Sequence, residues 1–320
     1  KVTQEGPYEE GKGLGVTVNI AEGPRYRVGE IAVEGNEIFT DREILNEFAL
    51  TEGDFYSEGT TQKSLLDILN MYRAQGNYFT RVRKNLDPQK EEGHVTDVDI
   101  VIREAERLRL GTIEIQGVTR MEGTGELIIL EDDEFVTKDY VVKREIKLDS
   151  GDVLDWSKIL EADRQLVNLN FFKSRPYPRP GILNLDPGFS EPFPRADDPT
   201  IADLLLQLEE VRTGLITFGG SYNTTFGPGA FIEYSKRNLF GRGQEIRTLL
   251  EFGGLRNRFS VQFLEPYLLG SEYSLDTEAY YYDIDSYGGR EFTEERYGLQ
   301  TTLSHPLWEH SRYFIGTRAE

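Results

Sequence analysis

The chain has 320 residues and a net charge of −20, because 56 acidic residues outnumber 36 basic ones. This acidity argues against nucleic acid as a partner, since binding it requires lysine and arginine to neutralise phosphates. The chain has no cysteine, which excludes disulfides, thiolate zinc sites and a cysteine nucleophile. It also has no run of 18 apolar residues, so we expect no transmembrane helix.

An internal repeat at an offset of 82 residues organises the first two-thirds of the chain. Residues 16–35 and 98–117 alternate in the same way between apolar and polar positions, which predicts a strand, a short connection and a second strand. The period fits a small domain in tandem better than a short solenoid repeat. The eight identical pairs are Val16/Val98, Ile20/Ile102, Glu22/Glu104, Arg25/Arg107, Arg27/Arg109, Gly29/Gly111, Ile31/Ile113 and Gly35/Gly117.

Two helices are expected between the strands of the first repeat unit, about residues 25–105. Thr40 and Glu43 have the spacing of a capping box, which marks the start of the first helix. Apolar stripes follow in both helices, and Gly76 is expected to end the second one. Strands around Val82 and Val98–Ile102 complete a strand–helix–helix–strand–strand order. The stripes are Ile44, Leu45 and Phe48, then Leu65, Leu66, Ile68, Leu69 and Tyr72.

The same order is expected in the second unit. Its strands are predicted near Leu110–Gly117 and Leu204–Val211, and each unit joins its helices by a glycine turn, residues 50–54 and 148–152. Residues 118–134 and the proline-rich residues 176–199 resemble insertions, and we expect the latter to be a loop. The helix stripes are Tyr140, Val141 and Ile146, then Ile159, Ala162, Leu166 and Leu169.

Residues 213–320 form a different kind of region. They hold 20 of the 37 aromatic residues and only −4 of the net charge. Long alternating segments favour strands of near ten residues, close to the ~9–11 of a transmembrane β-strand, whereas soluble strands are commonly ~5–6 residues. A soluble β-sandwich also alternates and stays open as an alternative. The segments are 214–222, 229–237, 244–253, 257–264, 273–283, 295–304 and one from Arg312; girdle candidates are Tyr280, Tyr281, Tyr282, Tyr287, Trp308 and Tyr313.

Together these features resemble the BamA family of outer-membrane assembly factors, in which tandem polypeptide-transport-associated (POTRA) domains precede a membrane barrel. The resemblance rests on the joining sequence LEEVRTGLITFGGSY (208–222) and on NLFGRGQ (238–244) and LEPYLLG (264–270). It implies α+β POTRA domains followed by an incomplete antiparallel transmembrane β-barrel. The expected divisions are 1–24 as the end of a preceding POTRA domain, 25–106 and 107–212 as POTRA domains, and 213–320 as the first six barrel strands and part of a seventh. We therefore expect a fragment of a longer protein.

The resemblance implies a non-enzymatic outer-membrane protein with its POTRA domains in the periplasm. It would fold and insert outer-membrane proteins at a lateral seam, with unfolded outer-membrane proteins, accessory periplasmic lipoproteins and outer-membrane lipid as partners. The seam strand would be residues 214–222. The glycines there either weaken closure of the seam or only relieve crowding. The predicted seam residues are Gly214, Leu215, Ile216, Thr217, Phe218, Gly219 and Gly220.

Two further surfaces are candidates for partner docking. The strand near residues 79–84 would offer a sheet edge through Phe79, Arg81 and Arg83, although basic residues there also protect an edge from pairing. The first helix of the second unit, expected over Lys138–Lys147 and including Lys138 and Arg144, would face an accessory lipoprotein, on the resemblance alone.

No motif for catalysis, cofactor binding or metal binding was found. The histidines His94, His305 and His310 belong to no zinc or triad signature, and Gly11–Gly15 is a turn without a following helix. The acidic residues 131–134 favour a solvated loop over a calcium site. Two other functions stay open: a two-partner-type secretion or translocation-module transporter, and a soluble periplasmic binding module.

Overall fold

A computed structural model describes residues 2–5, 15–18, 24–88, 94–121, 123–131, 134–173, 188–224, 227–253, 256–285, 293–308 and 311–320. The chain divides into two compact units. One comprises residues 1–108 and 153–156, and the other comprises residues 109–152 and 157–320. The turn at residues 11–15, the acidic run 131–134, His310, Tyr287 and much of the proline-rich segment lie wholly or partly outside the described residues.

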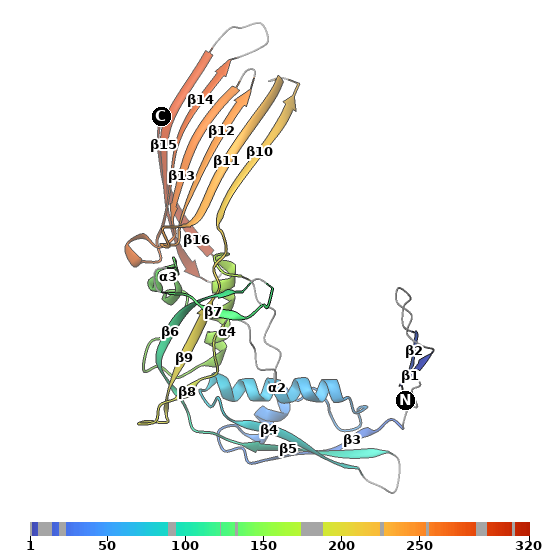
Figure 1. The fold of residues 1–320 in the computed structure, drawn as a ribbon. Helices are drawn as coiled ribbons and strands as arrows, with labels where there is room; N and C mark the ends of the chain where they lie inside the picture. The colour runs from blue at the N-terminus through green and yellow to red at the C-terminus, as the bar shows by residue number, and fades with distance from the viewer. Residues whose placement is uncertain are drawn as a thin grey trace. The chain divides into compact units, whose positions relative to one another are not determined.

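The first repeat unit, within the first compact unit, has the predicted strand–helix–helix–strand–strand order (Figure 1). Its elements are β3 (Arg27–Glu34), α1 (Asp41–Glu47), α2 (Glu58–Ala74), β4 (Arg81–Pro88) and β5 (Val95–Arg103). The sheet order is β3-β5-β4, with β3 parallel and β4 antiparallel to β5. The helices cover this sheet, and their apolar sides meet it in one core. The core residues are Val28, Ile44, Phe48, Leu65, Ile68, Tyr72, Val98, Ile100 and Ile102.

The helix signals in the first unit are confirmed with one exception. Thr40 caps α1, since its side chain accepts from the Glu43 amide while the Glu43 carboxylate accepts from the Thr40 amide at 2.9 Å. Gly76 follows the end of α2 with φ +90°, a left-handed conformation that suits glycine. Leu45 was wrongly placed in the buried stripe, because it is 36% exposed while Ile44 is fully buried.

Upstream of this unit lie β1 (Val2–Glu5) and β2 (Gly15–Val18), which form a two-stranded antiparallel sheet. The interpretation of residues 1–24 as the end of a preceding POTRA domain stays a prediction.

The second repeat unit contains β6 (Arg109–Arg120), β7 (Leu127–Ile129), α3 (Asp139–Lys143), α4 (Trp156–Asn168), β8 (Phe193–Pro194) and β9 (Ile201–Leu208), with sheet order β7-β6-β9-β8. The predicted helix over 138–147 is wrong in length: α3 ends at Lys143, and Ile146 lies beyond it. The segment 118–134 adds β7 as a short partner for the end of β6. The last strand runs over 201–208 rather than 204–211.

The repeat reflects a bulge that occurs twice. In β3 the register shifts between Val28 and Ile31, and in β6 it shifts between Leu110 and Ile113. The carboxylate of Asp97 accepts from the Glu30 amide at 2.8 Å, and Asp203 accepts from the Thr112 amide at 2.6 Å. A Cβ at Gly29 would lie 2.0 Å from Asp97, and one at Gly111 would lie 2.2 Å from Asp203. Glycine is therefore required where the carboxylate closes the bulge.

The last part of the chain is one seven-stranded antiparallel sheet in sequence order. Figure 1 shows the long strands side by side in an open, curved wall. The described strands make one continuous sheet rather than the two packed sheets of a β-sandwich. The strands are β10 (Gly214–Asn223), β11 (Gly227–Leu239), β12 (Gln244–Gly253), β13 (Arg256–Glu265), β14 (Ser274–Asp285), β15 (Thr293–Trp308) and β16 (Ser311–Ala319), of 9 to 16 residues each.

Among the described residues no helix is both long enough and apolar enough to cross a membrane.

Candidate functional site

One end of the long sheet is formed by its first strand, β10, and the other end by β16. The seam was predicted on β10. Among the described residues this strand pairs only with β11, since it stands at the end of the order β10 to β16. An unpaired edge presents a row of N–H and C=O groups that another strand can complete. All seven predicted seam residues, 214–220, lie on this strand.

The ladder shows which backbone groups point to this edge. The Arg237 amide donates to the Thr213 carbonyl at 3.3 Å, and the register continues from this pair through the whole of β10 without a shift. Opposed residues in an antiparallel ladder alternate between hydrogen-bonded and non-hydrogen-bonded pairs. Odd-numbered residues of β10 therefore bond to β11. Even-numbered residues, such as Ile216 and Phe218, direct their N–H and C=O groups to the unpaired edge.

The same even-numbered residues carry the apolar face of the strand. Ile216, Phe218 and Tyr222 are 66%, 80% and 78% exposed. Since side chains alternate along a strand, Leu215 and Thr217 lie on the opposite face. The edge thus joins free backbone groups to exposed apolar side chains, a combination that is unfavourable in water.

The three glycines of β10 differ in their surroundings. A Cβ at Gly219 would lie 2.7 Å from the Phe231 ring, so this glycine makes room for the ring. A Cβ at Gly214 or Gly220 would meet its nearest neighbours at 3.7 Å, an ordinary contact. Relief of crowding therefore explains Gly219 but not Gly214 or Gly220.

An apolar face extends across the sheet. The register aligns one row through six strands, in the order Phe218, Ile232, Leu250, Phe259, Tyr281 and Tyr297. Directly opposed residues project on the same side of a sheet. Most of this row is exposed, with Phe218 at 80% and Tyr297 at 74%.

The opposite face carries charges that pair with one another across neighbouring strands. Arg247 lies 3.6 Å from Glu233, and Arg258 lies 3.1 Å from Glu278. Gln262 donates to both carboxylate oxygens of Asp276, at 2.9 and 2.8 Å. A sheet with one apolar face and one ion-paired face is typical of a barrel wall between lipid and a polar interior.

Aromatic side chains gather near one end of this sheet. The Tyr313 and Tyr273 hydroxyls lie 3.1 Å apart, and the Tyr273 ring lies 4.4 Å from the His305 ring. Amphipathic rings of this kind suit a membrane interface. Tyr280, in contrast, was wrongly expected in a girdle, because it is 7% exposed and shares the charged face with Arg258.

The predicted docking residues of the first unit lie where the sequence indicated. β4 is an edge strand of its sheet, and Phe79, Arg81 and Arg83 are exposed. Lys84 points inward instead and bonds to Glu58 and the Tyr56 hydroxyl. This pairing, above all the hydrogen bond from Lys84, lowers the pKa of Glu58 to about 2.

The two predicted docking residues near α3 behave differently. Lys138 is exposed. Arg144 is not on an open surface, because its side chain is only 14% exposed and its guanidinium lies 4.0 Å from the centre of the Tyr267 ring. Arg144 is thus occupied within the chain and was wrongly assigned to an exposed docking face.

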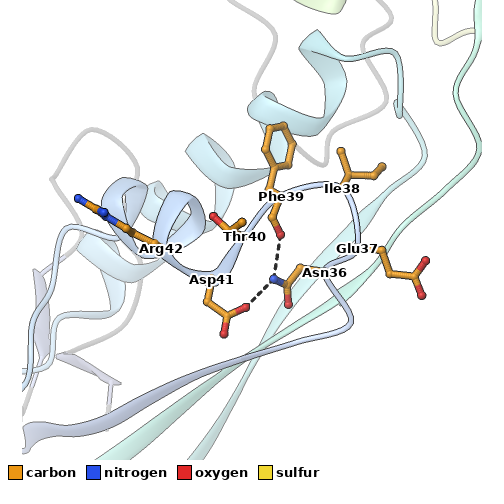
Figure 2. A pocket seen from close by; sticks show the side chains of 7 residues that line it. All are labelled: Asn36, Glu37, Ile38, Phe39, Thr40, Asp41 and Arg42. Carbon is orange, nitrogen blue, oxygen red and sulfur yellow. Dashed lines mark hydrogen bonds between the residues drawn. The ribbon is translucent and has the colours of Figure 1, made fainter.

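A pocket of 480 Å³ lies beside the loop before α1, lined by residues 36–42. Figure 2 shows the Asn36 side chain pointing to the Phe39 carbonyl and Asp41, to which it donates at 3.0 and 2.7 Å. The Glu104 carboxylate accepts from the Glu37 and Ile38 amides at 2.8 and 2.9 Å. These groups hold the loop in place. In the described parts of the chain, no cluster of three or more residues suits a metal ion.

Comparisons with known proteins agree with this architecture. Residues 26–105 match the POTRA family model, described as a surface antigen variable number repeat, and residues 238–320 match the Omp85 superfamily domain. The chain is 25% identical to the outer membrane protein assembly factor BamA of Nitratidesulfovibrio vulgaris over 98% of its own length. It is 26% identical to a putative outer membrane protein assembly factor of Treponema pallidum over 80% of its length.

The chain spans 36% and 28% of the lengths of these two relatives. Among solved structures, it resembles the crystal structure of BamA from Haemophilus ducreyi lacking POTRA domains 1–3. That likeness has a TM-score of 0.73 at 19% identity, over 92% of this chain and 50% of that one, and it shows a common fold.

Proposed function

We propose that this chain folds β-barrel proteins into the outer membrane by pairing with their strands along β10. The chain belongs to the Omp85 superfamily and carries POTRA units followed by part of the barrel domain. The superfamily places the long sheet in the outer membrane and the POTRA units in the periplasm. Its assembly factors are not enzymes.

The observation that supports strand pairing is the register of β10, whose even-numbered residues direct their N–H and C=O groups away from β11 on an apolar wall. Each unpaired N–H or C=O group of a strand that enters hydrocarbon costs several kcal/mol of free energy. The even-numbered residues of β10 offer complementary groups to such a strand. Gly214 and Gly220 leave little side chain near this edge, which favours its opening and closing.

The partners of the whole protein are part of the same proposal. They are unfolded outer-membrane proteins, outer-membrane lipid and accessory periplasmic lipoproteins. For the lipoproteins, the candidate surfaces are formed by exposed residues: Arg81 and Arg83 on β4, Phe79 just before it, and Lys138 beside α3. Arg81 and Arg83 also fit an edge that is protected against pairing.

Reconstitution of the full-length protein in liposomes tests the proposed function. We expect added unfolded barrel proteins to become resistant to protease and to migrate as folded species, at rates above those of empty liposomes. Export of one dedicated substrate without folding of general clients would overturn the proposal and favour a secretion transporter. Solubility of the intact protein without detergent would favour a soluble binding module.

A further inference from the structure

A hydrogen-bonded cluster connects the last POTRA domain to the barrel sheet within one compact unit. Its centre is the hydroxyl of Thr137, which donates to the Glu210 carboxylate and accepts from the Asn238 side-chain amide at 2.7 Å. Thr137 and Asn238 are 3% and 7% exposed. A buried hydroxyl with both a donor and an acceptor partner is fully satisfied, and its removal takes the acceptor from the buried Asn238 amide and one hydrogen bond from the Glu210 carboxylate.

Each of the three side chains belongs to a different segment. Thr137 precedes α3, Asn238 lies at the end of β11, and Glu210 lies between β9 and β10. The Glu210 carboxylate also accepts from the backbone amides of Val136 and Thr137, at 3.1 and 2.7 Å. Glu210 stands four residues before the first residue of β10, so whatever holds it also holds the start of the seam strand.

The turn between β11 and β12 is shaped to receive the segment before α3. The Lys138 amide donates to the Gly241 carbonyl at 2.9 Å. Gly241 has φ +73°, and a Cβ there would lie 1.9 Å from the Val136 carbonyl oxygen. Asn238 has φ +50° and accepts from the Gly243 amide at 2.9 Å, so it fixes the turn as well as the contact. No side chain fits at position 241 without separating the two segments.

A second contact lies beside the first. The Arg144 guanidinium stacks on Tyr267, which lies just after β13, and Arg144 pairs with the buried Glu145 at 3.4 Å. Burial, followed by the nearby Glu145 charge, raises the pKa of Tyr267. Two neighbouring turns of the sheet therefore hold the same POTRA segment, residues 136–145.

We propose that Thr137, Glu210 and Asn238 are positioning residues that fix the last POTRA domain to the barrel and thereby set the position of the seam strand β10. We call the contact among Thr137, Glu210 and Asn238 the joint. The statement that client strands pair with β10 rests on the proposed function, whereas the existence of the joint does not. With the joint intact, a client delivered along the POTRA domain meets β10 at one defined place. With the joint released, the approach of the client to β10 varies.

Distance measurements by electron spin resonance in the full-length protein test the joint directly. The chain has no cysteine, so spin labels attached at Lys158→Cys on α4 and Ser221→Cys on β10 are the only ones within it. We expect one narrow distance distribution in the parent protein. Thr137→Val, which keeps the side-chain shape, should add a second, longer population, with about a tenfold change in the ratio of released to joined molecules, equivalent to about 1.4 kcal/mol.

Three variants make the result decisive. Thr124→Val changes an exposed threonine of the same domain and should leave the distribution unchanged. Asn238→Ala should reproduce the effect of Thr137→Val, and the double variant should add little to either, because both remove one contact. Unchanged distances in Thr137→Val and Asn238→Ala, in protein whose barrel migrates as folded, would overturn the joint. If the distances broaden in Thr137→Val but the parent protein folds no client, the joint stands and only the proposed function is refuted.

Discussion

Proline substitutions at neighbouring positions of β10 test its two edges one at a time: the unpaired edge and the edge that bonds to β11. Ile216 directs its N–H to the unpaired edge, whereas Thr217 bonds to β11. Proline has no N–H and is tolerated on an edge strand only where that group faces away from the ladder. Ile216→Pro should therefore leave the barrel folded and remove one group that a client strand needs. Thr217→Pro should destabilise the barrel itself.

The expected slowing of client folding by Ile216→Pro follows from the loss of the Ile216 N–H as a hydrogen-bond donor. A client carbonyl left without a donor costs about 1–3 kcal/mol in protein measurements. If this cost falls in the rate-limiting pairing step, client folding should slow by about 5- to 160-fold, since 1.36 kcal/mol is tenfold in rate. The assay is the rate of client folding in liposomes, with gel migration of the heated and unheated protein as the check on the barrel.

The control is Ile216→Ala, which removes the exposed side chain and keeps the N–H. It should retain most of the folding rate if the backbone is what matters. Parent-like client folding by Ile216→Pro with an intact barrel would refute the edge-pairing argument. Equal losses in Ile216→Pro and Ile216→Ala would assign the effect to the side chain.

Three further predictions concern stability. Gly219→Ala should lower the free energy of unfolding by about 1–3 kcal/mol in urea titrations because its Cβ meets the Phe231 ring, and Phe231→Ala should suppress that loss. Thr40→Ala should cost about 1 kcal/mol through loss of the α1 cap, seen as increased hydrogen exchange in α1. Because folding lowers the Glu58 pKa, the Glu58–Lys84 pair should stabilise the first unit above about pH 4.5 and lose this contribution as pH falls towards 2. Glu58→Gln should flatten that part of the stability–pH profile.

Alternation and capping predicted the elements well because both are local. The expected strand 244–253 has the bounds of β12, and the expected strands around it differ by only a few residues at their ends. The Thr40 capping box needs only a spacing of three residues. The repeated arginines make the same contact in both units, although it joins distant residues: Arg27 donates to the Gly53 carbonyl at 2.6 Å, and Arg109 donates to the Gly151 carbonyl at 2.8 Å.

Contacts between distant segments were not predictable from those patterns. Arg144 appeared to be an available charge, yet its stacking on Tyr267 joins residues far apart in the chain. Asn238 appeared only as part of NLFGRGQ, a sequence similar to the family's turns. Its buried hydrogen bond to Thr137 spans 101 residues, and the only local signal was two glycines closely following an asparagine. The shortness of α3 was missed for a related reason, since Val141, Val142 and Ile146 are all buried although only the first two are helical.

Site-directed disulfide capture of a stalled client tests strand pairing at β10 most directly. The absence of cysteine makes each introduced thiol unique within the chain. Phe218→Cys on β10 and Phe259→Cys on β13 lie in the same apolar row, but of these two strands only β10 stands at an end of the described sheet. The account predicts a disulfide between Phe218→Cys and one position of the client strand, and none from Phe259→Cys. Equal capture at both positions, or capture at neither, would contradict it.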